Sequence, residues 1–290
     1  MSAFSQINGR LGILLLLFAF TSCERLRPQP DQTGDAPQTA IPSPTPFLPP
    51  SVHLAFGNPS NATQDTDNDE NYLVVGDGSA FSYNNERGTV NWISWKTTRA
   101  DLGDSIRRPD FRPDPRLPSG FDRIGYYDYS GSGYDRGHMV PSADRFANAK
   151  LNEETFMMTN IVPQTGALNQ FPWERFESFA RSQVYRGFDA YQIAGVYGEQ
   201  RVLKRKVVVP TNCWKIIALL PRGRSADRID ERTRIIAVDM PNIKGIENDA
   251  WEKYKTTIRE IETKTGYDFF STMPRKLQDE IETRKETVNP

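Results

Sequence analysis

The chain has 290 residues, with 36 Lys and Arg against 37 Asp and Glu, which gives a net charge of −1. Without the three basic and three acidic residues of the first fifty, 33 remain against 34, and this balance excludes a general electrostatic attraction to nucleic acid. Any such attraction must be local. The two histidines, His53 and His138, are too few for a multi-histidine metal site, so a catalytic histidine would act as a single base.

The first 22 residues have the pattern of a bacterial signal peptide. One basic residue, Arg10, precedes an apolar run at 11–20 that is too short to span a membrane. Small residues then lead to Cys23, as in bacterial lipoprotein signals, so we expect a lipid anchor on Cys23. Ordinary cleavage and secretion is the alternative. Both routes predict an extracytoplasmic protein, either anchored in the periplasm or at the cell surface, or secreted.

A proline-rich segment follows, from residue 24 to residue 50. It holds eight prolines, with Thr, Ser, Gln and Asp between them and few apolar side chains. Burial of so little apolar surface cannot offset the entropy of folding, so we predict a disordered tether. The remaining residues, 51–290, are enough for one large domain with its own core.

Short segments rich in Val, Ile, Tyr and Trp alternate with Gly, Pro, Asn and Asp clusters through this domain, and they predict strands. They lie at 71–75, 91–95, 126–130, 156–162, 190–198, 206–210, 213–220 and 234–240. Helical spacing of apolar residues predicts three helices, at 169–185, at 248–263 and after Pro274. Many strands with irregularly placed helices predict an α+β fold, in which helices flank a mixed, largely antiparallel sheet.

Several residues have a structural rather than a functional interpretation. Cys213 lies in an apolar segment, and a reactive thiol needs basic neighbours and exposure, so we predict a buried structural thiol. Trp173, Phe176 and Phe179 fit the buried side of a helix better than a platform for stacking bases. The basic segment at 201–210 favours a solvated hairpin over a phosphate-binding patch.

Two stretches combine residue types that carry chemistry. The first, YDRGHMVPSADR at 134–145, holds His138 at the end of a predicted strand, after Gly137. We expect this glycine to let the backbone come close to a bulky ligand. The second, TNIVPQTGALNQFPWERFE at 159–177, predicts a strand end, a loop and a helix start. His138 would then face a helix-borne amide, Asn169, across a cleft.

These residue types suit the cleavage of a phosphodiester bond, which needs a base, a cation and a proton donor. An imidazole ordinarily has a pKa of about 6.5, so His138 can accept a proton from water at pH 7. The amide oxygen of Asn169 is a hard but weak ligand, which would hold Mg²⁺ with most of its waters. One of those waters would be acidic enough to protonate the leaving oxygen.

Glu177 and Arg99 complete this set. Glu177 lies eight residues after Asn169, which corresponds to about 12 Å along an ideal helix. Both side chains do not readily reach one ion at that distance, so we expect Glu177 to act through a coordinated water. Pro172 is compatible with a first helical turn and leaves the helix start, and this distance, open. Arg99 would supply a cation for the phosphate in the transition state.

The ordered motifs resemble the DNA/RNA non-specific endonuclease family, the ββα-metal nucleases. The resemblance rests on DRGH, the PSAD after it, TN nine residues before LNQ, and the W…FE that follows. The segments VHLAFGNPSNAT, NWISWKTTR, FRPDPRLPSGF and YDFFSTMPRKLQDEIE are similar to secreted bacterial members, so it extends over residues 51–282. A lone DRGH would be a weak match to the family, whereas the ordered set of motifs is specific for it.

The resemblance implies a mixed α/β fold with the active site in a unit of two strands and a helix, the ββα-metal unit. It implies His138 as the general base and Asn169 as the single direct ligand of Mg²⁺, with Mn²⁺ as an alternative ion. It implies Glu177 as the residue that orients a metal-bound water.

Three further residues are assigned by the resemblance. Asn160 is a site-shaping amide, and Arg99 is the transition-state arginine. Arg136, inside the motif, either touches phosphate or pairs with an acid. A variable loop separates Arg99 from His138, so other arginines near it stay open as alternatives: Arg107, Arg108 and Arg112.

Two other classes of protein remain to be compared. A zinc hydrolase needs more ligands than two histidines and one thiol, and the chain has no HExxH motif. An inactive nuclease-like envelope lipoprotein that binds nucleic acid or a partner protein would be expected to have lost His138 or Asn169, and both are present. The sequence favours a metal-dependent endonuclease that hydrolyses DNA and RNA, single- or double-stranded. It leaves open whether an inhibitor protein protects the producing cell.

Overall fold

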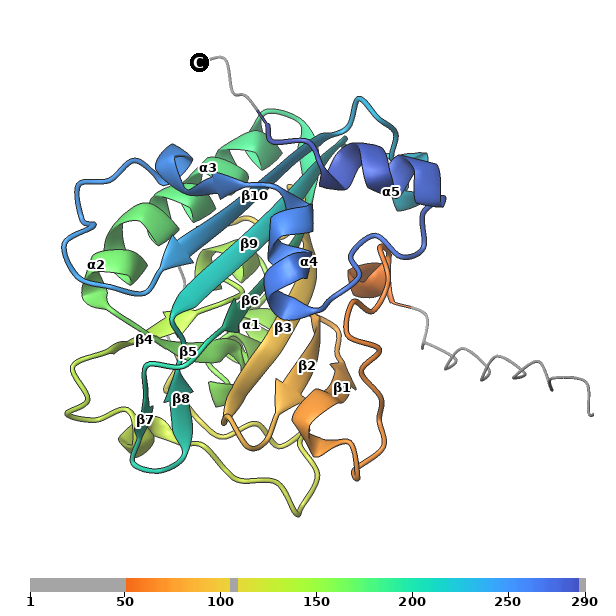
Figure 1. Ribbon diagram of the computed structural model, residues 1–290. Coiled ribbons are helices and arrows are strands. Elements are labelled where there is room, and N and C mark those ends of the chain that lie inside the picture. The colour runs from red at the N-terminus through yellow and green to blue at the C-terminus, as the bar shows by residue number, and fades with distance from the viewer. Residues whose placement is uncertain (1–50, 105–108, 287–290) are drawn as a thin grey trace, which may run out of the picture. The chain divides into compact units, whose positions relative to one another are not determined.

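The computed structural model describes residues 51–104 and 109–286, within the compact unit Pro46–Pro290 (Figure 1). The predicted signal peptide, Cys23 and the predicted tether at 24–50 lie outside the described residues. Within the described ranges, no helix combines the length and the apolar character needed to cross a bilayer.

A seven-stranded antiparallel sheet forms the framework of this unit (Figure 1). Its strands lie in the order β1 (Tyr72–Val75), β2 (Ala80–Asn84), β3 (Thr89–Thr97), β6 (Phe188–Tyr197), β9 (Asn212–Pro221), β10 (Arg234–Pro241) and β11 (Lys255–Thr256). Two two-stranded antiparallel sheets lie outside it, β4 (Asp135–His138) with β5 (Ile161–Gln164) and β7 (Arg201–Leu203) with β8 (Val207–Val209). The predicted α+β fold with a largely antiparallel sheet is confirmed.

Five α-helices flank the sheets among the described residues. They are α1 (Ala149–Glu154), α2 (Gly166–Leu168), α3 (Glu174–Tyr185), α4 (Ile258–Thr265) and α5 (Arg275–Glu282). A π turn at Asn169–Trp173 joins α2 to α3. The ββα unit expected around the active site is therefore present as β4, β5 and the helical run that ends in α3.

The side chains of β9 alternate between two hydrophobic cores, because successive residues of a strand point to opposite faces. Cys213 and Ile217 pack in the core that includes the buried side of α3. Trp214 and Ile216 pack in a second core with α4 and α5. The sheet is thus covered by α3 on one face and by α4 and α5 on the other. Lys215 lies on the α3 side, where it contacts that helix.

The structural interpretations of Cys213 and of the apolar residues of the helix are confirmed. Cys213 is fully buried, and burial raises the pKa of its thiol to about 12. Trp173 and Phe176 are buried in the core, and Phe179 packs against it. The basic segment at 201–210 forms the β7–β8 hairpin, so it is a hairpin as predicted.

Two predicted strands differ from the structure. Residues 126–130 hold a 3-10 turn, which is closed by a hydrogen bond of 2.8 Å from the Gly125 backbone amide to the Asp128 carboxylate. The strand predicted at 156–162 begins only at Ile161, because Met158–Asn160 forms a 3-10 turn. In both segments apolar content was taken for a strand, whereas local hydrogen bonds close a turn.

The helix predicted at 248–263 was placed too early. Helix α4 begins at Ile258, because Thr257 caps it: the Thr257 hydroxyl accepts a hydrogen bond from the Glu260 amide, and the Glu260 carboxylate accepts one from the Thr257 amide. The preceding residues form a 3-10 turn at Trp251–Tyr254 and then β11. A capping box therefore decided the boundary that apolar spacing alone did not locate.

Candidate active site

His138 ends strand β4, and the glycine before it is required by packing within the protein. A Cβ added to Gly137 would lie 1.8 Å from Oε1 of Gln164. The expectation that Gly137 makes room for a ligand is therefore corrected, because the Gln164 side chain fills that space. The His138 ring packs against Phe111 and Phe156, with centroid distances of 5.5 and 5.0 Å. These contacts hold the imidazole in one place.

Asn169 and Glu177 lie on one helical run that departs from a regular α-helix. The π turn at Asn169–Trp173 contains Pro172, and α3 follows directly. A π turn accommodates an additional residue, because its hydrogen bonds run over five residues instead of four. Two turns of an α-helix take about seven residues, so the additional residue brings positions eight apart to the same side. The helix start that Pro172 left open is therefore a π turn that begins at Asn169.

These residues line a cleft of about 760 Å³. His138 reaches it from β4, and Asn169, Glu177 and Arg181 reach it from the helical run. Aromatic side chains, including Phe111, complete its wall. His138 and Asn169, which the sequence predicted to face one another, therefore line one cleft, and Glu177 lines it too.

Asp135, the first residue of β4, determines how Asn169 presents its side chain. Oδ2 of Asp135 accepts hydrogen bonds from Nδ2 of Asn169 (2.9 Å) and from Nε2 of Gln170 (2.8 Å). Since the carboxylate engages the amide nitrogen, the amide oxygen of Asn169 is the end that faces away from Asp135. The first residue of the DRGH motif thus orients a side chain that lies 34 positions later.

Glu177 is supported from inside the protein by a buried lysine. Nζ of Lys215, on β9, donates a hydrogen bond of 3.0 Å to Oε1 of Glu177, and the Lys215 side chain has no solvent exposure. The same ammonium lies 4.3 Å from the centroid of the Trp173 ring. Burial raises the pKa of Glu177 and lowers the pKa of Lys215, and their ion pair opposes both shifts. One oxygen of Glu177 is thus committed to Lys215.

Arg181 lines the cleft one helical turn after Glu177, and the sequence did not suggest it. Its guanidinium lies 3.3 Å from Oδ1 of Asp144 and 3.6 Å from Oε1 of Glu174. Asp144 is buried, and its other oxygen accepts three hydrogen bonds, from Trp95, Thr97 and Gln192. The spacing of four from Glu177 on one helix was the signal that could have found Arg181.

The structure does not bring Arg99 into the cleft. Its guanidinium donates a hydrogen bond of 3.0 Å to the carbonyl oxygen of Leu102 and lies 4.9 Å from the centroid of the Tyr185 ring. Tyr185 is the last residue of α3, eight positions after Glu177, which corresponds to about 12 Å along the helix. Arg99 therefore packs at the end of α3 that is remote from Glu177.

Of the three arginines named as alternatives to Arg99, the structure describes Arg112. Arg107 and Arg108 lie outside the described residues. Arg112 forms an ion pair of 3.4 Å with Glu153. Among the described residues that line the cleft, Arg181 is the only Lys or Arg.

Asn160 and Arg136 support the site through the backbone. Both ends of the Asn160 amide bind the chain: Oδ1 accepts from the Val140 amide, and Nδ2 donates to the Val140 and Thr155 carbonyls, each at 2.9 Å. The Arg136 guanidinium donates to the Tyr126 carbonyl (2.8 Å) and lies 3.7 Å from the centroid of that ring. Asn160 thus shapes the turn after His138, and Arg136 clamps a loop instead of pairing with an acid.

Comparison with known proteins agrees with this geometry. The family model described as DNA/RNA non-specific endonuclease matches residues 51–276. The chain belongs to the DNA/RNA non-specific endonuclease family. A nuclease from Nostoc sp. is 41% identical over 280 residues, which cover 96% of this chain and 98% of the relative. Nuclease C1 from Cunninghamella echinulata is 32% identical over 234 residues, which cover 75% of this chain and 86% of the relative.

A solved structure, that of the EndoG/EndoGI complex, shares the fold of this endonuclease. The TM-score is 0.65 at 22% identity, and the match covers 80% of this chain and 96% of the other. Membership of the family makes the protein a hydrolase that acts on nucleic acid and depends on a divalent metal. The expected fold and the expected class of enzyme are confirmed.

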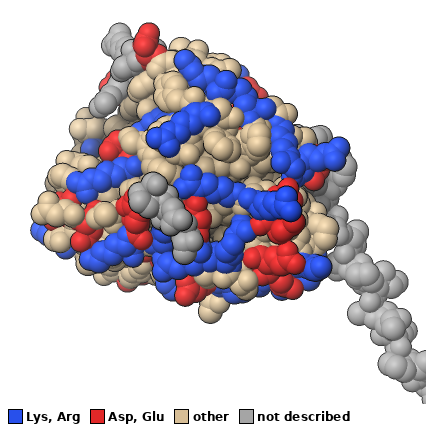
Figure 2. Space-filling view, turned by 90° about the horizontal axis from the view of Figure 1, so that it is seen from above, with Lys and Arg blue, Asp and Glu red and all other residues tan. Residues whose placement is uncertain are grey.

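The surface of this endonuclease carries both signs of charge. Figure 2 shows Lys and Arg side chains intermixed with Asp and Glu across the face that it displays. Neither sign of charge has that face to itself. Within the cleft, Arg181 is a group that can attract phosphate.

Proposed function

We propose that the protein is a sugar-non-specific endonuclease that hydrolyses phosphodiester bonds of DNA and RNA, with His138 as general base and Asn169 as the direct ligand of a hydrated Mg²⁺. The observation that carries this proposal is the shared cleft of His138, Asn169 and Glu177. His138 can act as the base, and the oxygens of Asn169 and Glu177 suit a hard cation, so the cleft offers two of the requirements of phosphodiester hydrolysis.

His138 has the first role in the proposed reaction. Its neutral imidazole takes a proton from water in the cleft, and the resulting hydroxide attacks the phosphorus. The bond between phosphorus and the leaving sugar oxygen breaks with its electron pair on that oxygen, which takes up a proton from solvent. Packing against Phe111 and Phe156 holds the imidazole, so little orientational entropy is lost when the substrate binds.

The side chains around Asn169 fit a hydrated hard cation. All the donors in question are oxygens, and Asp135 turns the Asn169 amide so that its oxygen faces away from the aspartate. Glu177 keeps one oxygen on Lys215 and would reach the ion through a coordinated water. When bound, a divalent cation supplies positive charge to the phosphate and acidifies the water that it holds. Mn²⁺ has similar ligand preferences and is expected to replace Mg²⁺.

Low sequence selectivity is expected if the protein contacts the phosphates of the substrate instead of its bases. The groups in the cleft interact with phosphate, which every nucleotide carries and which contains no sequence information. Arg181 contributes a guanidinium that can donate two parallel hydrogen bonds to a phosphate. Arg181 takes the role that the resemblance gave to Arg99.

The competing proposal is an inactive, nuclease-like lipoprotein. It is disfavoured because the base and the metal ligand are both present and share one cleft with Glu177. The proposed location is extracytoplasmic, through a lipid on Cys23 or through secretion, and it rests on the sequence pattern alone. Incorporation of labelled palmitate by the producing cell, present in the wild type and lost in Cys23→Ala, tests the anchor.

The first experiment compares the purified chain with His138→Ala and Asn169→Ala on supercoiled plasmid and on single-stranded RNA. We expect the wild type to cut both substrates in Mg²⁺ and neither in EDTA, and both variants to be inactive. His53→Gln is the matched control, because His53 is the other histidine and lies outside the cleft. A folded wild type that leaves both substrates intact in Mg²⁺ and Mn²⁺ would support the inactive lipoprotein.

A further inference from the structure

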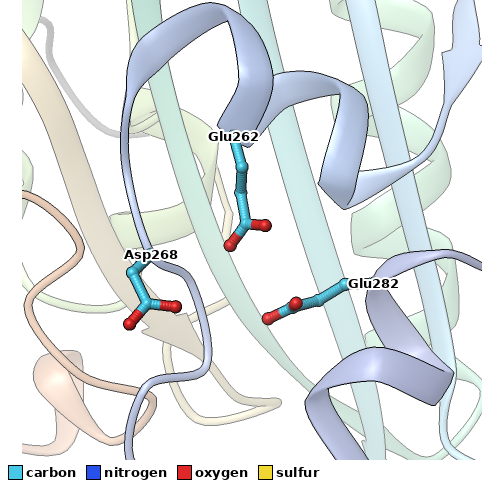
Figure 3. A group of neighbouring side chains, drawn as sticks. All are labelled: Glu262, Asp268 and Glu282. Carbon is cyan, nitrogen blue, oxygen red and sulfur yellow. The ribbon is translucent and has the colours of Figure 1, made fainter. Parts of the chain in front are cut away.

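Three carboxylates meet in the C-terminal part of the chain, away from the cleft. Glu262 comes from α4, Asp268 from the turn that follows it, and Glu282 from the last position of α5 (Figure 3). One carboxylate oxygen from each lies within 4.8 Å of the other two. None of the three lines the active-site cleft. Gly266 ends α4 with a φ of 75°, a left-handed conformation that turns the chain back toward the helix.

Glu282 provides a second, independent observation. Its side chain has no solvent exposure, and Oε1 is buried with no hydrogen-bond partner among the residues that the structure describes. The other oxygen, Oε2, accepts a hydrogen bond of 2.7 Å from the Arg259 guanidinium, with which it forms an ion pair. A buried carboxylate oxygen without a partner is costly, so its position indicates a ligand that completes it. Figure 3 shows the Glu282 carboxyl group pointing into the gap toward Glu262 and Asp268.

The charges around this gap do not cancel. Arg259 contacts Glu262 (3.0 Å), Glu282 (2.7 Å) and Asp279 (3.0 Å), and Arg275 contacts Asp279 (3.2 Å). With Asp268, four carboxylates stand against two guanidinium groups, and four minus two leaves two negative charges. One divalent cation would neutralise this excess.

We propose that Glu262, Asp268 and Glu282 form a second metal site, which binds Ca²⁺ and links α4 to α5. The available ligands are all oxygens, as Ca²⁺ requires, and they come from non-helical as well as helical backbone, which suits its irregular coordination better than the strict octahedron of Mg²⁺. Asp268 is exposed, so water can complete the coordination. The nearby Arg259 weakens the site, and we expect a Kd on the order of 10⁻⁴–10⁻³ M.

A proton is the competing ligand. Burial and the neighbouring Glu262 raise the pKa of Glu282 to about 7. Below that pH a proton on Oε1 would satisfy the carboxyl group without a metal. The site is therefore tested at pH 8, where the proton competes least.

The test is made on the full chain carrying Asn169→Ala, which removes the ligand of the active-site ion and leaves the second site unchanged. Tb³⁺ replaces Ca²⁺ as a luminescent probe, because Tyr267 precedes Asp268 and its ring lies 6.3 Å from the ring of Trp214, so both can sensitise the ion. We expect saturable luminescence that Ca²⁺ displaces, and calorimetry with Ca²⁺ alone should show one site.

Variants of the carboxylates decide the outcome. Glu282→Gln, and Asp268→Asn if the first does not fold, should weaken Ca²⁺ binding at least tenfold and abolish the rise of the thermal midpoint with Ca²⁺. Asp279→Asn is the matched control, because this acid also contacts Arg259 but lies outside the three, and it should keep binding. Absence of Ca²⁺ binding at millimolar concentration, or equal binding by Glu282→Gln, overturns the proposal and assigns a proton to Glu282. Neither result depends on nuclease activity.

Discussion

Nζ of Lys215 lies 3.0 Å from Oε1 of Glu177, so a fully buried ammonium on β9 supports a carboxylate that lines the cleft. The two residues are 38 positions apart in sequence. The pair crosses from the sheet to α3 through the hydrophobic core, where Trp173 lies against the ammonium. The position of Glu177 is therefore coupled to the packing of the core.

Replacing Lys215 with Met should lower the free energy of unfolding by about 3–5 kcal/mol, because Glu177 would keep its burial and lose its partner. The double variant Lys215→Met, Glu177→Gln should regain part of that loss, since the uncompensated charge is then removed. Urea unfolding of the wild type, both single variants and the double variant measures this coupling. Additive losses would show that the ion pair contributes nothing beyond its two parts.

Asp135→Ala should raise the Mg²⁺ concentration needed for half-maximal activity about 10–100-fold, because the amide of Asn169 would lose the acceptor that orients it. The maximal rate at saturating Mg²⁺ should change less. Titration of plasmid cleavage with Mg²⁺ measures both quantities. Gln170→Ala, which removes the other donor to Asp135, is the control and should leave the Mg²⁺ dependence near that of the wild type.

Gly137→Ala should destabilise the protein by about 1–3 kcal/mol, because the new methyl group would overlap the Gln164 side chain. The same substitution in a Gln164→Ala background should cost much less, since all three atoms nearest the new Cβ belong to Gln164. Thermal unfolding of the four proteins provides the comparison. An equal cost in both backgrounds would place the constraint in the backbone of β4.

Arg181→Met should lower kcat/KM by about 10²–10³-fold, because the cleft would lose the guanidinium that we propose donates to phosphate. Arg99→Met should stay near the wild-type value, since Arg99 packs on Tyr185 at the other end of α3. Initial rates on plasmid, with circular dichroism to verify folding, measure both effects. The reverse ranking would return the transition-state role to Arg99.

His53 should make stability depend on pH. Burial lowers its pKa, and both ring nitrogens bind the backbone, Nε2 at 2.9 Å from the Asp77 carbonyl oxygen and Nδ1 at 3.2 Å from the Lys96 amide. The unfolded imidazole therefore takes up its proton at a higher pH than the folded one, so the contribution to stability is present above about pH 6.5 and is lost as the pH falls.

The measurement for His53 is the free energy of unfolding of the wild type and of His53→Gln at pH 7.5 and pH 5.5. The difference between the two proteins should shrink at the lower pH. Since the variant shares every other titrating group, including His138, their contributions cancel in the difference. A difference that is the same at both pH values would contradict the assignment.

The sequence by itself determined the family, the α+β class and the type of chemistry, because these depend on which residues are present and on short spacings along the chain. The order of DRGH, TN and LNQ predicted that His138 and Asn169 share a site, and both line one cleft. The apolar composition of residues 213–220 likewise predicted the strand β9, since composition between turn residues is a local property. The sequence did not predict the turn at 126–130 or the start of α4, because hydrogen bonds within each segment outweighed its apolar content.

Only the tertiary structure decided which groups support the catalytic set. In the sequence, Lys215 is a single polar residue within an apolar strand. It contacts Glu177 because the sheet order places β9 next to α3. Gly137 faces Gln164 because β4 and β5 pair in one register. Arg99 and Arg181 could not be ranked from spacing, since a distance in sequence does not determine a distance through a sheet. The physical reason is common to all three cases: strand pairing and core packing join positions that the chain itself separates.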